Sequence, residues 1–201
     1  MKSKLQETYP TAEYRTLNSP MIYVADFRLR TENERGVEIH PENPSTPDGT
    51  DAMACLKLVN DEQLHIDFSV FDDSQFKKEE DENKDDEHCE CCFFRSDAGE
   101  DGWISFIEIK DCKPNNIPTH KQKAKEQIIS TVKHFRKNQI IAKNKPVHGI
   151  ISFPRRTKTA FNDCIFRDHI EIFEMRKKYG ILFLTSNTIK VSLEKLEPCN
   201  V

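Results

Sequence analysis

Apolar and polar residues alternate with period two in several short segments, and this pattern predicts β-strands. The first such segment is 20–30, in which Tyr23, Ala25, Phe27 and Leu29 share one face and Asp26, Arg28 and Arg30 share the other. Segment 64–71 alternates in the same way. Segment 51–59 fits a strand or a helix, and the turn-like residues 60–63 favour a hairpin of 51–59 with 64–71.

The segment 88–113 predicts a central hairpin, because two apolar strands flank an acidic turn that contains glycine. Both faces of this hairpin carry large apolar side chains. One face has Cys92, Phe94, Ile104 and Phe106, and the other has Cys89, Cys91, Phe93, Trp103, Ile107 and Ile109. Strands that are apolar on both faces belong inside a sheet rather than on its surface.

The pattern changes to helical spacing after this hairpin. Thr119 is the expected N-cap of a helix to about residue 138, with Ala124, Ile128, Val132 and Phe135 on its apolar face. A buried strand is expected at 147–153. A second helix is expected at about 161–178, with an apolar face of Phe166, Ile170, Ile172 and Phe173. Gly180 should end it, before strands at 181–184 and 189–193.

This order predicts one α/β domain over residues 1–201, with a mixed central sheet, an N-terminal antiparallel meander and flanking helices. Residues 1–20 are expected to be an arm or a short helix, and 31–50 a loop. Residues 72–87 form an acidic run that is expected to be a mobile loop.

Composition indicates a soluble protein with a real core, since 36% of the residues are hydrophobic and 32% are charged. The chain has neither an apolar run of membrane-spanning length nor the apolar core of a signal peptide, so we expect a cytoplasmic location and no membrane partner. Residues 1–100 hold 11 basic and 24 acidic residues, whereas the rest hold 19 and 10. The basic half could bind phosphates, or the two halves could simply attract each other.

Candidate chemistry lies on the hairpin. If Arg95 faces Trp103, then Glu90 lies opposite Glu108, and His88 lies opposite Lys110. Opposed side chains share a face with their Cβ atoms roughly 5 Å apart. Two carboxylates so placed suit Mg²⁺ or Mn²⁺, and the lysine could orient a water or stabilise developing charge.

An acid before one strand, a turn, an apolar-Glu-x-Lys strand, a helix and a further strand together resemble the core of the PD-(D/E)XK nuclease superfamily, over about residues 64–155. The resemblance implies a restriction-endonuclease-like core that hydrolyses the phosphodiester bonds of DNA or RNA. It implies that Glu90 and Glu108 bind the metal and that Lys110 positions the attacking water. Lys123 and Gln127 match the helix position that contacts the site.

The chain departs from the family pattern at two points. Glu90 stands in place of the usual Asp and follows Cys89 rather than a proline. The first acidic motif has only Glu7 and Glu13 as candidates, and Asp67 could supply a third carboxylate for the metal.

Other interpretations remain beside the nuclease. Glu108 and Lys110 could form a structural network on a half-exposed strand. Residues 88–92 could bind zinc, although buried cysteines acting as small apolar residues fit their spacing better. The basic loop with Arg155, Arg156 and Lys158 follows a strand end and could hold nucleic acid. A catalytically inactive module of the nuclease fold, or a protein-interaction domain with a protein partner or a second copy, is the alternative function.

Overall fold

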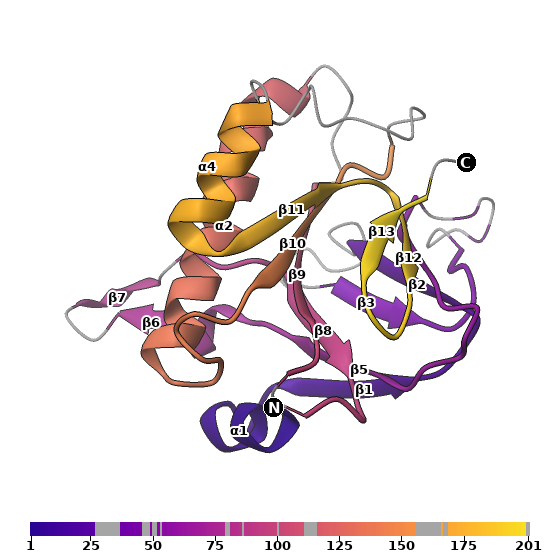
Figure 1. Cartoon of the computed structure of the whole chain (residues 1–201), viewed down its shortest axis with the longest axis horizontal. Helices are drawn as coiled ribbons and strands as arrows, with labels where there is room; N and C mark the ends of the chain where they lie inside the picture. Colours follow the sequence, from indigo (N-terminus) through magenta and orange to yellow (C-terminus); the bar gives the residue numbers. More distant parts are fainter. Residues whose placement is uncertain are drawn as a thin grey trace.

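The computed structural model describes residues 1–26, 37–45, 49, 52, 54–78, 81–85, 87–99, 101–110, 116–155, 166 and 169–199. Within these residues the fold is mixed α/β, with two large mixed sheets and helices α1, α2 and α4 (Figure 1). The helices are α1 (Lys2–Thr8), α2 (Ile117–Lys137) and α4 (His169–Tyr179), and a 3-10 turn, η1, covers Asp73–Phe76. None of these helices is long and apolar enough to cross a membrane.

The first large sheet has the strand order β1-β5-β8-β9-β10-β11. Its strands are β1 (Glu13–Leu17), β5 (Ile66–Val70), β8 (Cys91–Arg95), β9 (Ile104–Ile109), β10 (Val147–Ser152) and β11 (Ile181–Thr185). The strands from β1 to β9 pair antiparallel, whereas β9, β10 and β11 pair in parallel. The expected strands at 147–153 and 181–184 are therefore present. The expected N-terminal antiparallel meander is not, because β2, β3 and β4 follow β1 in the chain but lie in the second sheet.

The second large sheet has the order β13-β12-β4-β2-β3. Its strands are β13 (Leu196–Pro198), β12 (Thr188–Val191), β4 (Leu56–Val59), β2 (Met21–Asp26) and β3 (Val37–His40). A separate two-stranded sheet, β6 (Lys77–Lys78) with β7 (Asp81–Asp85), projects from the body (Figure 1).

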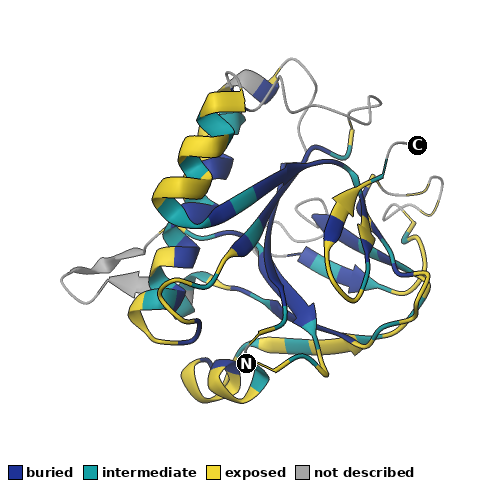
Figure 2. Ribbon diagram, viewed as in Figure 1, coloured by how far each residue is buried: buried dark blue, intermediate teal, exposed yellow. Residues whose placement is uncertain are grey.

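Each face of the first sheet covers a different layer. On one face Phe94, Phe106 and Phe183 pack with apolar residues of α1 and α2, and Ile172 and Met175 of α4 lie against the same cluster. On the other face, residues of β5, β8 and β9 pack against the second sheet. The buried core therefore follows both faces of the central strands (Figure 2). The expected flanking helices cover one face of this sheet, and β2, β4 and β12 of the second sheet cover the other face.

The expected hairpin of 51–59 with 64–71 was also wrong. Strand β4 pairs with β2 and β12 in the second sheet, whereas β5 pairs with β1 and β8 in the first. Buried Asn60 turns the chain between the two sheets, since its Nδ2 donates to the carbonyls of Ser19 and Leu64. Gln63 completes the turn with a positive φ of 50°.

Three segments of the N-terminal half contain more regular structure than the sequence predicted. Residues 1–20 contain α1, the short helix that was one of the two expectations, and α1 buries Leu5 in the core, while β1, which was not expected, completes the edge of the first sheet. The expected loop 31–50 contains β3. The expected acidic loop 72–87 contains η1, β6 and β7, and Phe76 is fully buried.

Helix α2 confirms its predicted apolar face, because Ala124, Ile128, Val132 and Phe135 are all fully buried. It begins earlier than expected, with Asn116 rather than Thr119 at the N-cap and Pro118 inside its first turn. Proline is tolerated there because the first turn has no intrahelical acceptor for its missing N–H.

Helix α4 presents a different face from the predicted one. Ile172, Met175 and Tyr179 lie against the core, whereas Ile170 and Phe173 are 64% and 65% exposed. The first part of the predicted helix, 161–168, lies outside the described residues except for buried Phe166. Gly180 ends the helix with a φ of 62°, as its position predicted.

Candidate functional site

The candidate site lies where β8 begins and β9 ends. The predicted hairpin register is confirmed along the strands, where Cys91 pairs with Ile107 and Phe94 pairs with Ile104. All residues of β9 are buried, as strands with two apolar faces should be. Charged side chains at the end of such a strand therefore leave water when the protein folds.

Glu108 and Lys110 form an ion pair at this strand end. The Glu108 side chain is fully buried and that of Lys110 nearly so. The Lys110 N–H donates to the carbonyl of Ser152 at 2.9 Å, which fixes the residue after β9 to the end of β10. Beyond Lys110, neither carboxylate oxygen of Glu108 has a hydrogen-bond donor among the described residues.

Burial and nearby negative charge raise the pKa of Glu108 well above its ordinary value. Burial contributes most, the charge of Glu90 adds to it, and Asp26 adds a smaller amount. The Lys110 ammonium opposes this increase, because an adjacent cation lowers the pKa of a carboxyl group. A cation added beside Glu108 would lower the pKa in the same way.

Glu90 departs from the predicted register. Its N–H donates to the carbonyl of Ile107 at 3.0 Å, although Ile107 already pairs with Cys91. Glu90 therefore does not lie directly opposite Glu108, and this irregularity at the start of β8 resembles a β-bulge. Its charge nevertheless acts on Glu108, and its half-buried side chain is the more accessible of the two.

Helix α2 holds the segment that precedes β8. The Gln127 Nε2 donates to the carbonyl of His88 at 2.7 Å, and the Cys89 N–H donates to Thr131 Oγ1 at 2.9 Å. Gln127 thus contacts the strand segment that carries Glu90, which is where the helix candidate was expected. Lys123, one turn earlier on α2, is exposed and lies 3.8 Å from a carboxylate oxygen of Glu87.

The remaining expected residues are not brought to this site. Asp67 pairs with Phe94, four residues along β5 from the position opposite Glu90, or about 13 Å at the usual rise. Its carboxylate instead binds Lys2 at 2.7 Å and Thr16 at 2.5 Å, so Asp67 as a third metal ligand was wrong. His88 binds Asp73 at 3.0 Å and stacks on Phe76, not beside Lys110.

Glu7 and Glu13, the candidates for the first acidic motif, are both exposed, and Glu13 binds Arg15. Arg155 is exposed at the end of β10, while Arg156 and Lys158 lie outside the described residues. Asp26 is the acidic residue that the sequence missed. The one indication in the sequence was that Asp26 is an acidic residue at the end of the apolar strand β2. Its proximity to Glu108 depends on the packing of the two sheets.

The cysteines behave as apolar core residues. Cys89 and Cys92 are buried on the helical face of the first sheet, and Cys91 is buried on the opposite face. Burial raises the pKa of all three thiols, which disfavours the thiolate that zinc requires. In the described part of the chain, no three His, Cys, Asp or Glu residues are grouped so that they could hold one metal ion.

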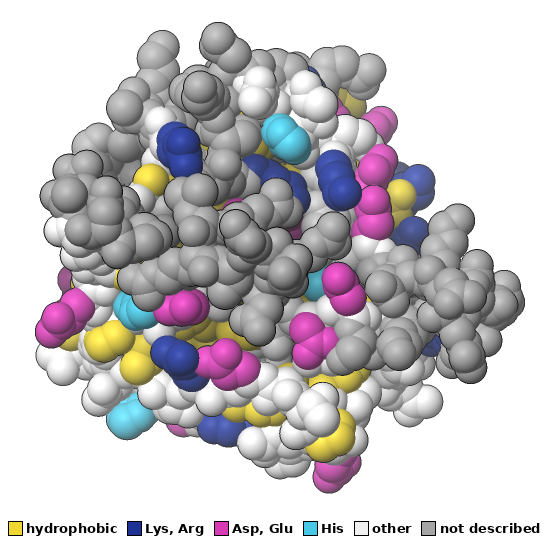
Figure 3. All heavy atoms as spheres, turned by 180° about the vertical axis from the view of Figure 1, so that it is seen from behind, with side chains coloured by type: hydrophobic (Ala, Val, Ile, Leu, Met, Phe, Trp, Pro, Cys, Tyr) yellow, Lys and Arg dark blue, Asp and Glu magenta, His cyan; other side chains and the backbone are white. Residues whose placement is uncertain are grey.

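Basic and acidic side chains are interspersed on the rear face, with the basic ones mostly in its upper half (Figure 3). Ion pairs also join the acidic and basic halves of the sequence, as between Glu87 and Lys123 and between Asp61 and Lys190. Attraction between the halves therefore accounts for part of the charge asymmetry.

The fold and site thus define a class, a mixed α/β protein with a buried Glu–Lys pair at the end of a central strand, β9, which pairs antiparallel with β8 and parallel with β10. Comparisons with family models, curated proteins and solved structures found no match for this chain.

Proposed function

We propose that the protein is a nuclease-like enzyme of the PD-(D/E)XK kind, which uses Mg²⁺ or Mn²⁺ to hydrolyse phosphodiester bonds in DNA or RNA. The observation that carries the proposal is the buried pair of Glu108 and Lys110, with Glu90 close enough to act on it. A buried carboxylate with one cationic partner and no other hydrogen-bond donor lowers the stability of the folded protein, unless a further cation or donor binds it.

The arrangement of strands supports the same proposal. Strand β8 begins after the acid Glu90, β9 carries Glu108-x-Lys110, α2 follows, and β10 then pairs with β9 in parallel. This is the order of elements that the sequence resemblance implies for a restriction-endonuclease-like core. Gln127 of α2 adds a contact from the helix to the strand segment beside Glu90.

The residues fit a hard divalent cation in their donor chemistry, since such ions prefer carboxylate oxygens. Glu90 and Glu108 would hold the ion, which would supply a Lewis acid for the phosphate and lower the pKa of a bound water. The Lys110 ammonium, already against Glu108, would orient the attacking water or stabilise charge on the phosphate oxygens. Gln127 would fix the backbone from which Glu90 projects.

The test is cleavage of plasmid DNA and single-stranded RNA by purified protein with Mg²⁺, Mn²⁺ or EDTA. We expect metal-dependent cleavage that falls at least about 100-fold in Glu108→Gln and in Lys110→Ala. Glu197→Gln, which changes an exposed carboxylate on β13, is the matched control and should cleave normally. Absence of cleavage by the wild-type protein with Mn²⁺, or full activity of Glu108→Gln, would refute the proposal.

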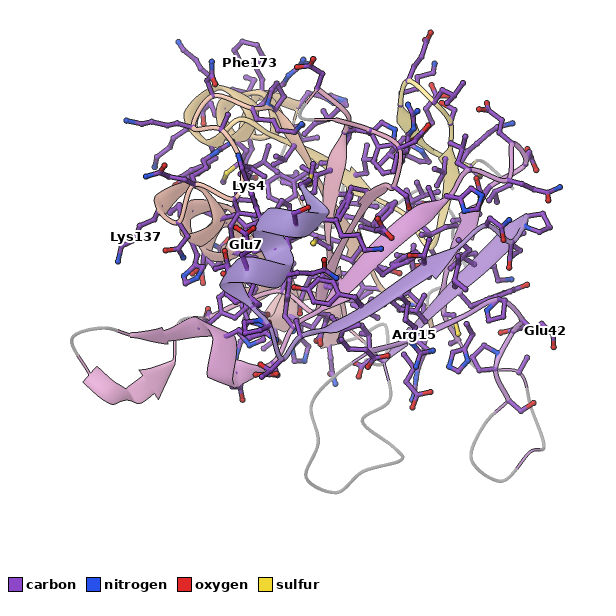
Figure 4. The ribbon with its side chains drawn as sticks, turned by 90° about the horizontal axis from the view of Figure 1, so that it is seen from below. Lys4, Glu7, Arg15, Glu42, Lys137 and Phe173 are labelled. Carbon is purple, nitrogen blue, oxygen red and sulfur yellow. The ribbon has the colours of Figure 1, made fainter. Side chains whose placement is uncertain are left out.

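A second candidate function is a catalytically inactive module of the same fold that binds a protein partner. Two observations favour it: Glu108 is fully enclosed, and α4 exposes Ile170 and Phe173. Figure 4 shows Phe173 pointing away from the body of the molecule. In that case Glu108→Gln would leave the function unchanged, whereas Phe173→Ser would abolish co-purification of the partner.

A further inference from the structure

Strand β1 forms one edge of the first sheet. It pairs with β5 on one side, and among the described residues no strand pairs with its other side. It runs along the lower rim of the molecule in Figure 1. Glu13, Arg15 and Thr16 are exposed, and Figure 4 shows Arg15 pointing away from the body of the molecule. The outer side of β1 is therefore accessible to another chain.

The register of the sheet shows which backbone groups of β1 point to the open edge. Backbone hydrogen bonds of His65 and Phe71 flank the ladder of β5 with β8, so the odd-numbered residues of β5 direct their N–H and C=O groups to β8. The even-numbered residues of β5 therefore bond to β1, where their partners in register are odd-numbered. The N–H and C=O groups of Tyr14 and Thr16 consequently point away from the sheet.

The side chains of β1 are complementary to those of an antiparallel copy of the same strand. If two copies meet at the open edge with Tyr14 opposite its equivalent, Glu13 of each copy lies opposite Arg15 of the other. Opposed side chains on neighbouring strands are close enough for an ion pair. A two-fold axis at Glu13 or Arg15 would place like charges opposite each other, and an axis at Thr16 would lose both ion pairs. Charge therefore selects the register centred on Tyr14.

Arg15 retains hydrogen-bond donors for this contact. Within one chain its Nε donates to Glu13, and its Nη1 donates to the carbonyl of Ile39 at 3.0 Å. A guanidinium has five N–H groups, so these two bonds leave donors for the carboxylate of a second copy. The bond to Ile39 also restrains the side chain before pairing, which reduces the entropy lost on association.

Charged residues on an edge strand often serve to prevent pairing with other chains. The second sheet has other protection at its edges, because Pro198 of β13 lacks an N–H and the Ile39 carbonyl of β3 already accepts a hydrogen bond from Arg15. Strand β1 has no proline and carries one charge of each sign two residues apart. This pattern favours an antiparallel copy of itself over strands with other charges.

We propose that two copies of this chain pair along β1 to form a symmetric dimer, in which the first sheets of the two copies are continuous. Tyr14 exchanges backbone hydrogen bonds with its equivalent at the two-fold axis, and Glu13 and Arg15 form an ion pair on each side of it. Strand β9 is three strands from β1, or about 14 Å at the usual spacing, so the interface does not include Glu108 or Lys110. Dimerisation does not depend on the nuclease-like activity proposed above.

The experiment is sedimentation velocity of the full chain from about 5 µM to about 200 µM. The test variants are Arg15→Glu and Glu13→Arg, and each of them places like charges at both contacts. A mixture of the two variants restores both contacts, because position 13 of one variant then meets the opposite charge at position 15 of the other. Lys195→Glu is the matched control, since Lys195 also pairs with a glutamate two residues away at the edge of the second sheet. Circular dichroism and thermal unfolding check that each variant is folded.

We expect the wild type to be a dimer at about 200 µM and to dissociate on dilution, as interfaces of small area do. Each charge variant alone should dimerise at least about tenfold more weakly, whereas their mixture should form a heterodimer of nearly wild-type affinity. Lys195→Glu should dimerise as the wild type does.

The proposal fails if the wild type is a monomer at about 200 µM, if either charge variant dimerises as tightly as the wild type, or if the two folded variants form no heterodimer. It also fails if the dimer persists in Arg15→Glu but is lost in Phe173→Ser, since that result would place the interface on α4.

Discussion

Removing the Lys110 ammonium should destabilise the protein in a pH-dependent way. In Lys110→Met the Glu108 carboxylate stays buried but loses its cationic partner, which raises its pKa further. Breaking a buried pair by removing one partner typically costs about 3–5 kcal/mol. Glu108 can avoid this cost by binding a proton. The free energy of that protonation is therefore the upper limit, at each pH, on the stability lost through the unpaired carboxylate.

The limit follows from the ordinary pKa of a glutamate, about 4.3, and about 1.36 kcal/mol per pKa unit. Neutralising Glu108 costs at most about 1 kcal/mol at pH 5 and about 4 kcal/mol at pH 7. Where the folded protein holds a proton that the unfolded chain has released, stability falls as the pH rises. Because the pKa of Glu108 is already raised to about 8 in the wild type, both proteins hold this proton at pH 5 and pH 7. The deficit of Lys110→Met relative to the wild type should therefore be similar at pH 5 and pH 7 and grow towards pH 9.

Urea unfolding of both proteins at pH 5, 7 and 9 measures this deficit. The matched control is Lys195→Met, which breaks an exposed pair with Glu197 that has the same spacing of two residues along the chain. We expect no measurable pH-dependent change in the control. Changing Glu108 and Lys110 together to methionine should restore stability to within about 1 kcal/mol of the wild type. A deficit that is independent of pH, or largest at pH 5, would contradict a buried, coupled pair.

Two further predictions concern β10 and its surroundings. Gly149→Ala should lower stability by about 1–3 kcal/mol in thermal unfolding, because its Cβ would lie 3.0–3.1 Å from side chains of α2 and β11. Gly99→Ala, with open space around it, should change little, and equal effects would argue against the tight packing. Burial lowers the pKa of His148, so the folded protein favours the neutral ring and loses stability as the pH falls below about 6.5. His148→Gln should make denaturant stability fall less between pH 7.5 and 5, and an unchanged slope would contradict this.

The sequence predicted those features that depend on local pattern. The 3.6-residue spacing identified the buried face of α2, and alternation with two apolar faces identified β8 and β9 as central strands. The register along β8 and β9 was predicted by placing Arg95 opposite Trp103 across the turn, and the observed pairs agree with it. Gly180 was recognisable because a helix often ends on a residue with positive φ.

The predictions that were wrong concern contacts between residues that are far apart in the sequence. Period-two alternation indicates that 64–71 is a strand, but it carries no information about whether β4, β1 or β8 is its neighbour. Glu90 leaves the predicted register beside a segment that α2 contacts through Gln127 and Thr131, and a strand pattern gives no sign of such contacts. The proximity of Asp26 to the site likewise requires the second sheet, which assembles from strands at both ends of the sequence.

The composition of the second sheet has a consequence for folding during synthesis. Strand β4 lies between β2 and β12, and β12 is about 130 residues later in the chain. While the ribosome makes the intervening residues, one edge of β4 has no strand to pair with, and apolar residues such as Leu56 and Leu58 lack part of their cover. We expect nascent chains that stop before residue 188 to bind chaperones or aggregate, and release of β12 to complete the fold in one late step.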